Sequence, residues 1–181
     1  RVVYFFKNLN LLDSFWSHTL HMFSEIIDPK EPIFVYNPHE WFSYARQETE
    51  KMLIKTLTEK KRRVFILVTG NYPLDKELKK QFITDSLVQY DIASGRTLSK
   101  KNYYFNIIGD YLIEALIDQR ISGRIDSFFK RTRVFNRDSQ TELSGIIASP
   151  GRNKLIISKN KKKAEKYKKL FAKSFFIKRI D

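Results

Sequence analysis

The stretch RRVFILVTG, residues 62–70, carries five consecutive apolar residues between a basic lead-in and a glycine. Two more apolar runs follow at 87–92 and 103–110, and the segment before the first of them has helical spacing. Apolar runs separated by a helix are typical of parallel strands that are covered on both faces. We therefore predict an α/β fold whose central mixed, mostly parallel sheet is flanked by helices.

Helical and extended patterns alternate upstream of this stretch. Residues 1–6 are apolar and fit either an edge strand or the end of a helix, and residues 11–27 have the apolar stripe of a helix. Two prolines then favour a break, after which 33–36 reads as a strand. Asn37-Pro38 has the chemistry of a helix start, so we expect a single helix over about 39–58.

Downstream of the glycine, a helix is predicted from about Asn71 to Ser86, and a glycine-containing turn at 93–96. Gly109-Asp110 has the composition of a hairpin turn between two strands. The second arm, at 111–118, is apolar with poor alternation, so a helix is the alternative there.

The last third of the chain has the weakest pattern. We expect residues 119–151 to be mostly irregular, 154–158 to form a short strand, and 160–176 to form a basic amphipathic helix. Taken with the upstream pattern, this predicts an N-terminal helical segment at 1–30 and an α/β domain at 31–181.

Composition restricts the classes of function. The net charge of +14 favours polyanionic partners, although a lysine-rich host proteome would produce the same bias. The absence of cysteine excludes disulfides and thiolate metal sites, and the chain fits the cytoplasm or another reducing compartment. No apolar run approaches the length of a membrane span. Because residue 1 is arginine, a preceding domain that carries the activity is a further alternative.

No catalytic motif is present. Thr69-Gly70-Asn71 lies between a strand and a helix but lacks both glycine-rich phosphate-binding patterns, so no nucleotide cofactor is expected. His18 and His21 have the spacing of a metal pair on a helix, but no third ligand lies nearby and we expect no metal. Asp91 and Asp110 fall near strand ends, where ligands bind open parallel sheets.

The order of elements from the helix at 39–58 to Asp110 resembles a phospholipase D-like domain. That family carries the motif H-x-K-x-x-x-x-D on its third strand, and aligning on Asp110 puts Tyr103 at the histidine and Phe105 at the lysine. Only the aspartate matches. The resemblance therefore implies a degenerate domain that has lost its phosphodiester chemistry and that senses or dimerises beside DNA-binding regulators.

Basic residues concentrate in the last third of the chain, where arginines are suited to phosphate contact. The candidate nucleic-acid-binding residues are Arg120, Arg124, Lys130, Arg131, Arg133, Arg137, Arg152, Lys161, Lys162, Lys163, Lys166 and Lys169. Phe128, Phe129, Tyr103 and Tyr104 would stack on bases if they are exposed.

Our leading prediction is a non-enzymatic nucleic-acid-binding or regulatory module, as a component of a larger nucleoprotein or multi-protein assembly. One alternative is a phospholipase D-like phosphodiesterase or nuclease with an altered active site that uses Asp110 and Asp91. Another is a protein-interaction domain that docks acidic partners, and a homodimer is also open.

Overall fold

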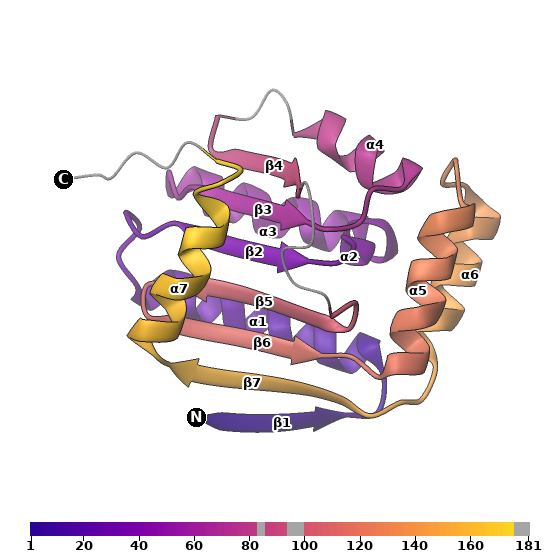
Figure 1. The fold of residues 1–181 in the computed structure, drawn as a ribbon, viewed down its shortest axis with the longest axis horizontal. Helices are drawn as coiled ribbons and strands as arrows, with labels where there is room; N and C mark the ends of the chain where they lie inside the picture. Colours follow the sequence, from indigo (N-terminus) through magenta and orange to yellow (C-terminus); the bar gives the residue numbers. More distant parts are fainter. Residues whose placement is uncertain (83–85, 94–99, 176–181) are drawn as a thin grey trace.

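The computed structural model describes residues 1–82, 86–93 and 100–175. These residues form one mixed sheet of seven strands in the order β1-β7-β6-β5-β2-β3-β4 (Figure 1). The strands are β1 (Val2–Phe6), β2 (Ile33–Asn37), β3 (Val64–Val68), β4 (Val88–Ile92), β5 (Tyr103–Ile108), β6 (Tyr111–Leu116) and β7 (Asn153–Lys159). The helices are α1 (Leu9–Ile26), α2 (Trp41–Ala45), α3 (Gln47–Glu59), α4 (Pro73–Gln81), α5 (Gln119–Arg131), α6 (Arg137–Ala148) and α7 (Lys161–Phe171).

The predicted parallel strands form one half of the sheet. β2 pairs with β3 and β3 pairs with β4, both in parallel, and helices connect each strand to the next. All five residues of β3 are buried because the strand lies inside the sheet and is covered on both faces. The α/β class and the mixed sheet are therefore confirmed.

The prediction of a mostly parallel sheet is wrong. β5 pairs antiparallel with β2, and β6, β7 and β1 continue the sheet in antiparallel pairs. The tight hairpin at Gly109, which adopts a positive φ of 56°, makes β5 and β6 antiparallel neighbours. A parallel neighbour would need a crossover of a dozen or more residues. The predicted hairpin turn is thus confirmed, and the helical alternative for 111–118 is excluded.

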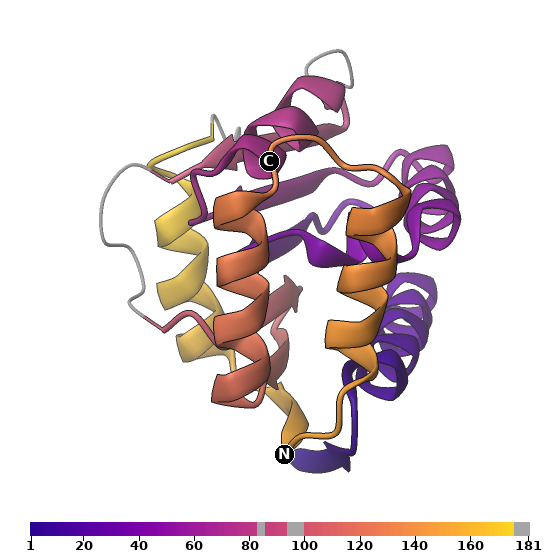
Figure 2. The ribbon, with the colours of Figure 1, turned by 90° about the vertical axis from the view of Figure 1, so that its right-hand side faces the viewer.

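The sheet separates two apolar cores. Alternate residues of β2 and β3 point to opposite sides, so that Ile33 and Val64 lie in one core, and Phe34 and Phe65 in the other. We call the side crossed by α7 the front and the side covered by α1 and α3 the back (Figure 1). Figure 2 shows the sheet between these layers, with α5 and α6 across its end.

Two helical predictions need correction. The helix expected over 39–58 is divided at Arg46, which has non-helical angles (φ −137°, ψ 52°) and donates to Asp13 of α1 at 2.6 Å. The region 119–151, expected to be irregular, contains α5 and α6. Asp118 caps α5 by accepting from the backbone of Arg120 and Ile121. The basic residues between the buried positions of α5 obscured its apolar stripe.

Residues 1–30, expected as a separate helical segment, belong to the same layers as the rest of the sheet. β1 pairs with β7 at the sheet edge, and α1 packs on the back face. Parts of three predictions lie outside the described residues: positions 83–85 of the helix expected up to about Ser86, positions 94–96 of the turn, and position 176 of the last helix. In the described ranges, no helix has the length and apolarity needed to cross a membrane.

Candidate functional site

The outer face of α7 carries a stripe of lysines. Lys162, Lys166 and Lys169 are spaced four and three residues apart, which places them on one side of the helix. All three side chains are exposed, and none has an acidic partner among the described residues. Lys161 is also exposed and unpaired but lies further round the helix. We call Lys162, Lys166 and Lys169 the lysine stripe.

The inner face of α7 fixes the helix on the sheet. Ala164 and Phe171 are fully buried, and the Phe171 ring lies 5.1 Å from the Phe34 ring of β2. Asn160 caps the helix by accepting from the backbone N–H of Lys163 at 3.0 Å. The lysine stripe therefore stands on a helix whose orientation is set by core packing rather than on a loose tail.

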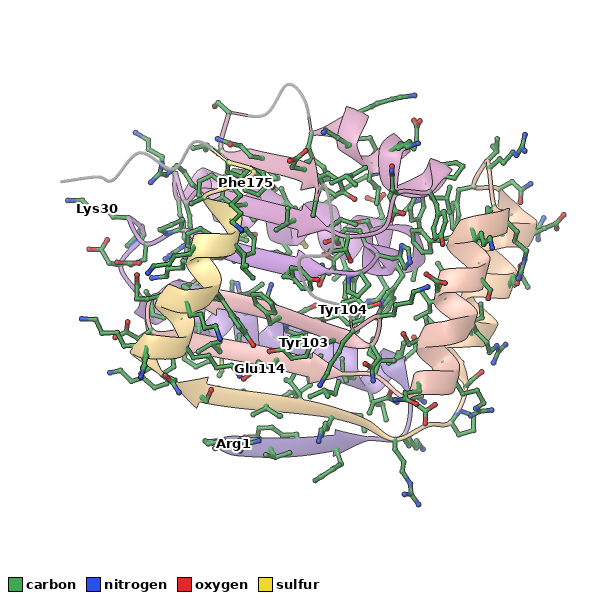
Figure 3. The ribbon with its side chains drawn as sticks, viewed as in Figure 1. Arg1, Lys30, Tyr103, Tyr104, Glu114 and Phe175 are labelled. Atoms are coloured by element: carbon green, nitrogen blue, oxygen red, sulfur yellow. The ribbon has the colours of Figure 1, made fainter. Side chains whose placement is uncertain are left out.

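A buried polar cluster secures the first turn of α7. The Lys163 ammonium donates to the Glu114 carboxylate at 2.5 Å, and the Tyr103 hydroxyl donates to the same oxygen. Tyr103 and Glu114 come from adjacent strands and lie beside each other under α7 (Figure 3). Burial, followed by the hydrogen bonds to Glu114 and Tyr167, raises the pKa of Tyr103 far above its ordinary value. This phenol therefore stays protonated and serves as a hydrogen-bond donor.

The other candidate cations lie away from α7. Arg120, Arg124 and Arg152 lie near the turn that joins α6 to β7. Arg120 donates to the Pro150 carbonyl at 2.6 Å, and Arg124 donates to the Ser149 hydroxyl at 2.8 Å. These two guanidinium groups thus hold a turn together, which uses part of their hydrogen-bonding capacity.

A further basic group surrounds the α5–α6 connection. Lys130, Arg133 and Arg137 are exposed and have no acidic partner among the described residues, whereas Arg131 forms an ion pair with Glu142. α5 and α6 stand at the end of the sheet where β2 and β3 finish, well separated from α7 on the front (Figure 1). The predicted basic residues therefore form separate groups rather than one continuous surface.

The aromatic residues that would stack on bases are not exposed. Phe128, Phe129 and Tyr104 are fully buried and Tyr103 is 9% exposed, so their rings belong to the two cores. The sequence could not distinguish these rings from exposed ones, because basic residues adjoin both pairs.

The carboxylates of the enzymatic alternative are not brought together. Asp110 lies in the β5–β6 hairpin, beside the start of β2, because β5 runs antiparallel to β2. Asp91 lies near the opposite end, one residue before β4 finishes. Its carboxylate accepts from Lys79 at 2.7 Å. Tyr103 and Phe105, at the family positions for histidine and lysine, form part of the front core.

Sequence reasoning missed a cluster around His39. Its Nδ1 lies 3.1 Å from Asp75 of α4, and its Nε2 lies 3.3 Å from Asp126 of α5. Lys101 donates to the second Asp126 oxygen at 2.8 Å, and the rings of Tyr72 and Phe129 stack on the imidazole. No spacing rule connects these residues, since the two aspartates are 36 and 87 positions from the histidine.

The electrostatics of this cluster favour a charged histidine. Burial alone would lower the pKa of His39, but the hydrogen bonds to Asp126 and Asp75 outweigh it and raise the pKa. The hydrogen bond from His39, together with that from Lys101, lowers the pKa of Asp126 to about 2. Both imidazole nitrogens are occupied by carboxylates, so neither faces a substrate. We interpret the cluster as an internal ion network that joins α4, α5 and the end of β2.

His18 and His21 do not form a metal site. Both lie on the exposed side of α1, and His21 faces Glu25 at 3.8 Å. No group of three His, Asp or Glu side chains within 1–82, 86–93 and 100–175 is arranged to hold a metal ion. Comparisons of the chain with protein-family models, with curated proteins and with solved structures found no match.

Proposed function

We propose that this chain is a non-enzymatic nucleic-acid-binding module whose principal contact surface is the lysine stripe of α7. The observation that carries the proposal is a row of exposed, unpaired ammonium groups on a helix fixed by a buried inner face. A helix rises 1.5 Å per residue, so successive lysines of the stripe lie roughly 4.5–6 Å apart along its axis. Such a row matches a linear array of phosphates better than a single small anion.

The chemistry of the stripe supports backbone contact rather than base reading. Lysine acts as a mobile point charge, and a phosphate contact of this kind carries no sequence information. The buried state of Tyr103, Tyr104, Phe128 and Phe129 removes the aromatic platform that single-strand binders use. We therefore expect affinity that depends strongly on salt and only weakly on base sequence.

The test is fluorescence anisotropy with labelled duplex DNA, duplex RNA and single strands at several salt concentrations. The variant Lys162→Glu/Lys166→Glu/Lys169→Glu reverses the whole stripe. Each lost phosphate contact reduces the slope of log K against log salt by about 1, so we expect a reduction of about 2–3.

A matched variant separates the stripe from net charge. Lys7→Glu/Lys30→Glu/Lys76→Glu makes the same change in charge at three exposed lysines outside α7, which likewise have no acidic partner among the described residues. This control should retain most of the salt slope. Equal losses in both triple variants would show that only the overall charge matters, and the absence of binding at low salt would refute the proposal. Binding to acidic proteins without binding to oligonucleotides would instead favour a protein-docking domain.

A further inference from the structure

A cavity of about 540 Å³ lies on the back of the sheet between α1, α2, α3 and α4. Its walls are largely apolar and include Trp16 of α1, Phe42 of α2, Ile54 of α3 and Ile66 of β3. A volume in this range accommodates a small organic molecule. The site is separate from the lysine stripe, because α7 crosses the opposite face of the sheet (Figure 2).

Three carboxylates from three helical segments line this cavity. Asp13 belongs to α1, Glu40 precedes α2, and Glu50 belongs to α3. Arg46 donates to one oxygen of Asp13 at 2.6 Å. Asn37 donates to one oxygen of Glu40. Among the described residues, the Glu50 carboxylate forms no hydrogen bond or ion pair, although neighbouring charges act on it. The carboxylates thus outnumber the one guanidinium that lies among them.

Asn37 provides an independent sign of a missing partner. The residue is 1% exposed and lines the cavity, and its side-chain oxygen has no hydrogen-bond partner in the described part of the chain. A buried amide oxygen without a partner is costly, and such atoms in folded proteins usually accept a bond from a ligand or water. The unpaired acceptor and the carboxylates both require hydrogen-bond donors.

The charge distribution makes this cavity unusual in a protein of net charge +14. The lysines at its border are Lys51 and Lys55, and each faces a glutamate on the outer surface, Glu48 and Glu59 respectively. These pairs offset the charge of the border lysines, so the three acidic side chains inside the cavity favour a cation. A bare metal ion does not fit, because the described carboxylates do not form a metal-ligating group.

We propose that this cavity binds an organic cation, namely an amine that carries an apolar or aromatic body. The ammonium N–H groups would donate to the free oxygens of Glu40 and Glu50 and to Asn37, while the apolar body fills the space beside Trp16 and Phe42. Ammonium groups are attracted to aromatic faces as well as to carboxylates, so both kinds of wall suit the same ligand.

The acid–base state of the empty cavity agrees with this assignment. Burial, offset in part by the Asn37 hydrogen bond, raises the pKa of Glu40 to about 7, and the nearby charges of Asp75 and Asp13 add to the effect. Burial followed by the charges of Asp13 and Glu40 raises the pKa of Glu50 to about 8, although Arg46 opposes the change. A bound cation would supply the counter-charge that the empty cavity lacks, so binding should release protons.

The test compares isosteric ligands of different charge. Phenethylamine and the larger naphthylmethylamine are the cationic probes, and phenylethanol and phenylpropionate are the neutral and anionic controls. Isothermal titration calorimetry and the fluorescence of Trp16 provide the readouts. We expect saturable amine binding with Kd below about 1 mM and at least about tenfold weaker binding of the alcohol. Titration in buffers of different ionisation enthalpy should reveal the released protons.

Single substitutions test whether the amine binds at these carboxylates. Glu50→Gln and Glu40→Gln should each weaken amine binding by about tenfold, since each removes one charged acceptor. Glu77→Gln is the matched control: it makes the same change on the neighbouring helix α4, and Glu77 is exposed and pairs with Lys80 rather than with a residue of the cavity. The proposal is overturned if neither amine binds below about 5 mM, if amine and alcohol bind equally, or if Glu77→Gln weakens binding as much as Glu50→Gln. Thermal unfolding of each variant confirms that the protein remains folded.

Discussion

Replacement of Arg62 tests the account of how α1 is held on the sheet. The Arg62 side chain is fully buried, and its two terminal nitrogens donate to four backbone carbonyls. The distances are 3.0 Å to Ser24, 2.7 Å to Ile27, 3.1 Å to Asp28 and 2.5 Å to Glu31. The guanidinium thus satisfies carbonyls at and beyond the end of α1, where the helix dipole also favours a cation.

The expected loss of stability on replacing Arg62 is the balance of two opposing contributions. Hydrogen bonds that involve a charged group contribute about 1.5–3 kcal/mol each, whereas burying the ion costs several kcal/mol. Arg62→Met removes the charge and leaves four carbonyls to find other partners. Each buried carbonyl left without a donor costs about 1–3 kcal/mol, and removal of the buried charge offsets part of that cost, so we expect a net loss of about 3–5 kcal/mol in the free energy of unfolding.

Urea unfolding at equilibrium measures this loss. With an m value of about 2 kcal/mol per molar, the midpoint should fall by about 2 M. Arg62→Lys keeps the charge but has at most three donors, so it should fall between wild type and Arg62→Met. The control is Arg63→Met, where the guanidinium lies over the Phe65 ring at 5.7 Å and its loss should cost no more than about 1 kcal/mol. A loss below about 1 kcal/mol in Arg62→Met would refute the reasoning.

Three further predictions concern the buried polar clusters. The pKa of His39 is raised above its unfolded value of 6.5, so protonated His39 stabilises the fold below that pH. The free energy of unfolding should therefore fall as pH rises through the folded pKa, by about 1.4 kcal/mol for each unit by which the pKa is raised. Urea titrations of His39→Gln between about pH 5.5 and 8.5 should lack this pH dependence. Gly70→Ala should cost about 1–3 kcal/mol in a thermal melt, since the new Cβ would lie 2.5 Å from Asp75 Oδ2 and closer still to His39, which the ion network holds in place. Glu114→Gln should cost about 1–2 kcal/mol in urea unfolding because Lys163 loses its buried counter-ion. Lys80→Gln, which breaks an exposed pair with Glu77, should change the urea midpoint very little.

Local sequence patterns predicted the central elements correctly. The apolar run of β3, the strand β2 and the stripe of α1 each follow from the spacing of neighbouring residues, which the chain carries without reference to its partners. Asn160 and the lysines after it likewise indicated α7 and its charged face. Patterns of this kind arise because burial on one side of an element repeats with the period of that element.

The candidate nucleic-acid-binding surface was predictable only in part. The lysine stripe lies within one helix and was therefore visible in the sequence. The ion pair that holds the first turn of α7 on the sheet was not visible. Glu114 and Lys163 are 49 positions apart, and only strand pairing and the packing of α7 bring them together.

The amino-acid sequence by itself determined the α/β class, the main strands and the excess of lysine near the end of the chain, because these depend on composition and local periodicity. Tertiary structure alone decided the antiparallel half of the sheet, the buried position of Arg62, the network around His39 and the carboxylate cavity. In each of these cases the stabilising contacts join residues that are far apart in the chain. A charged residue is therefore assigned to the surface from the sequence, and only the folded structure shows the distant partners that allow its burial.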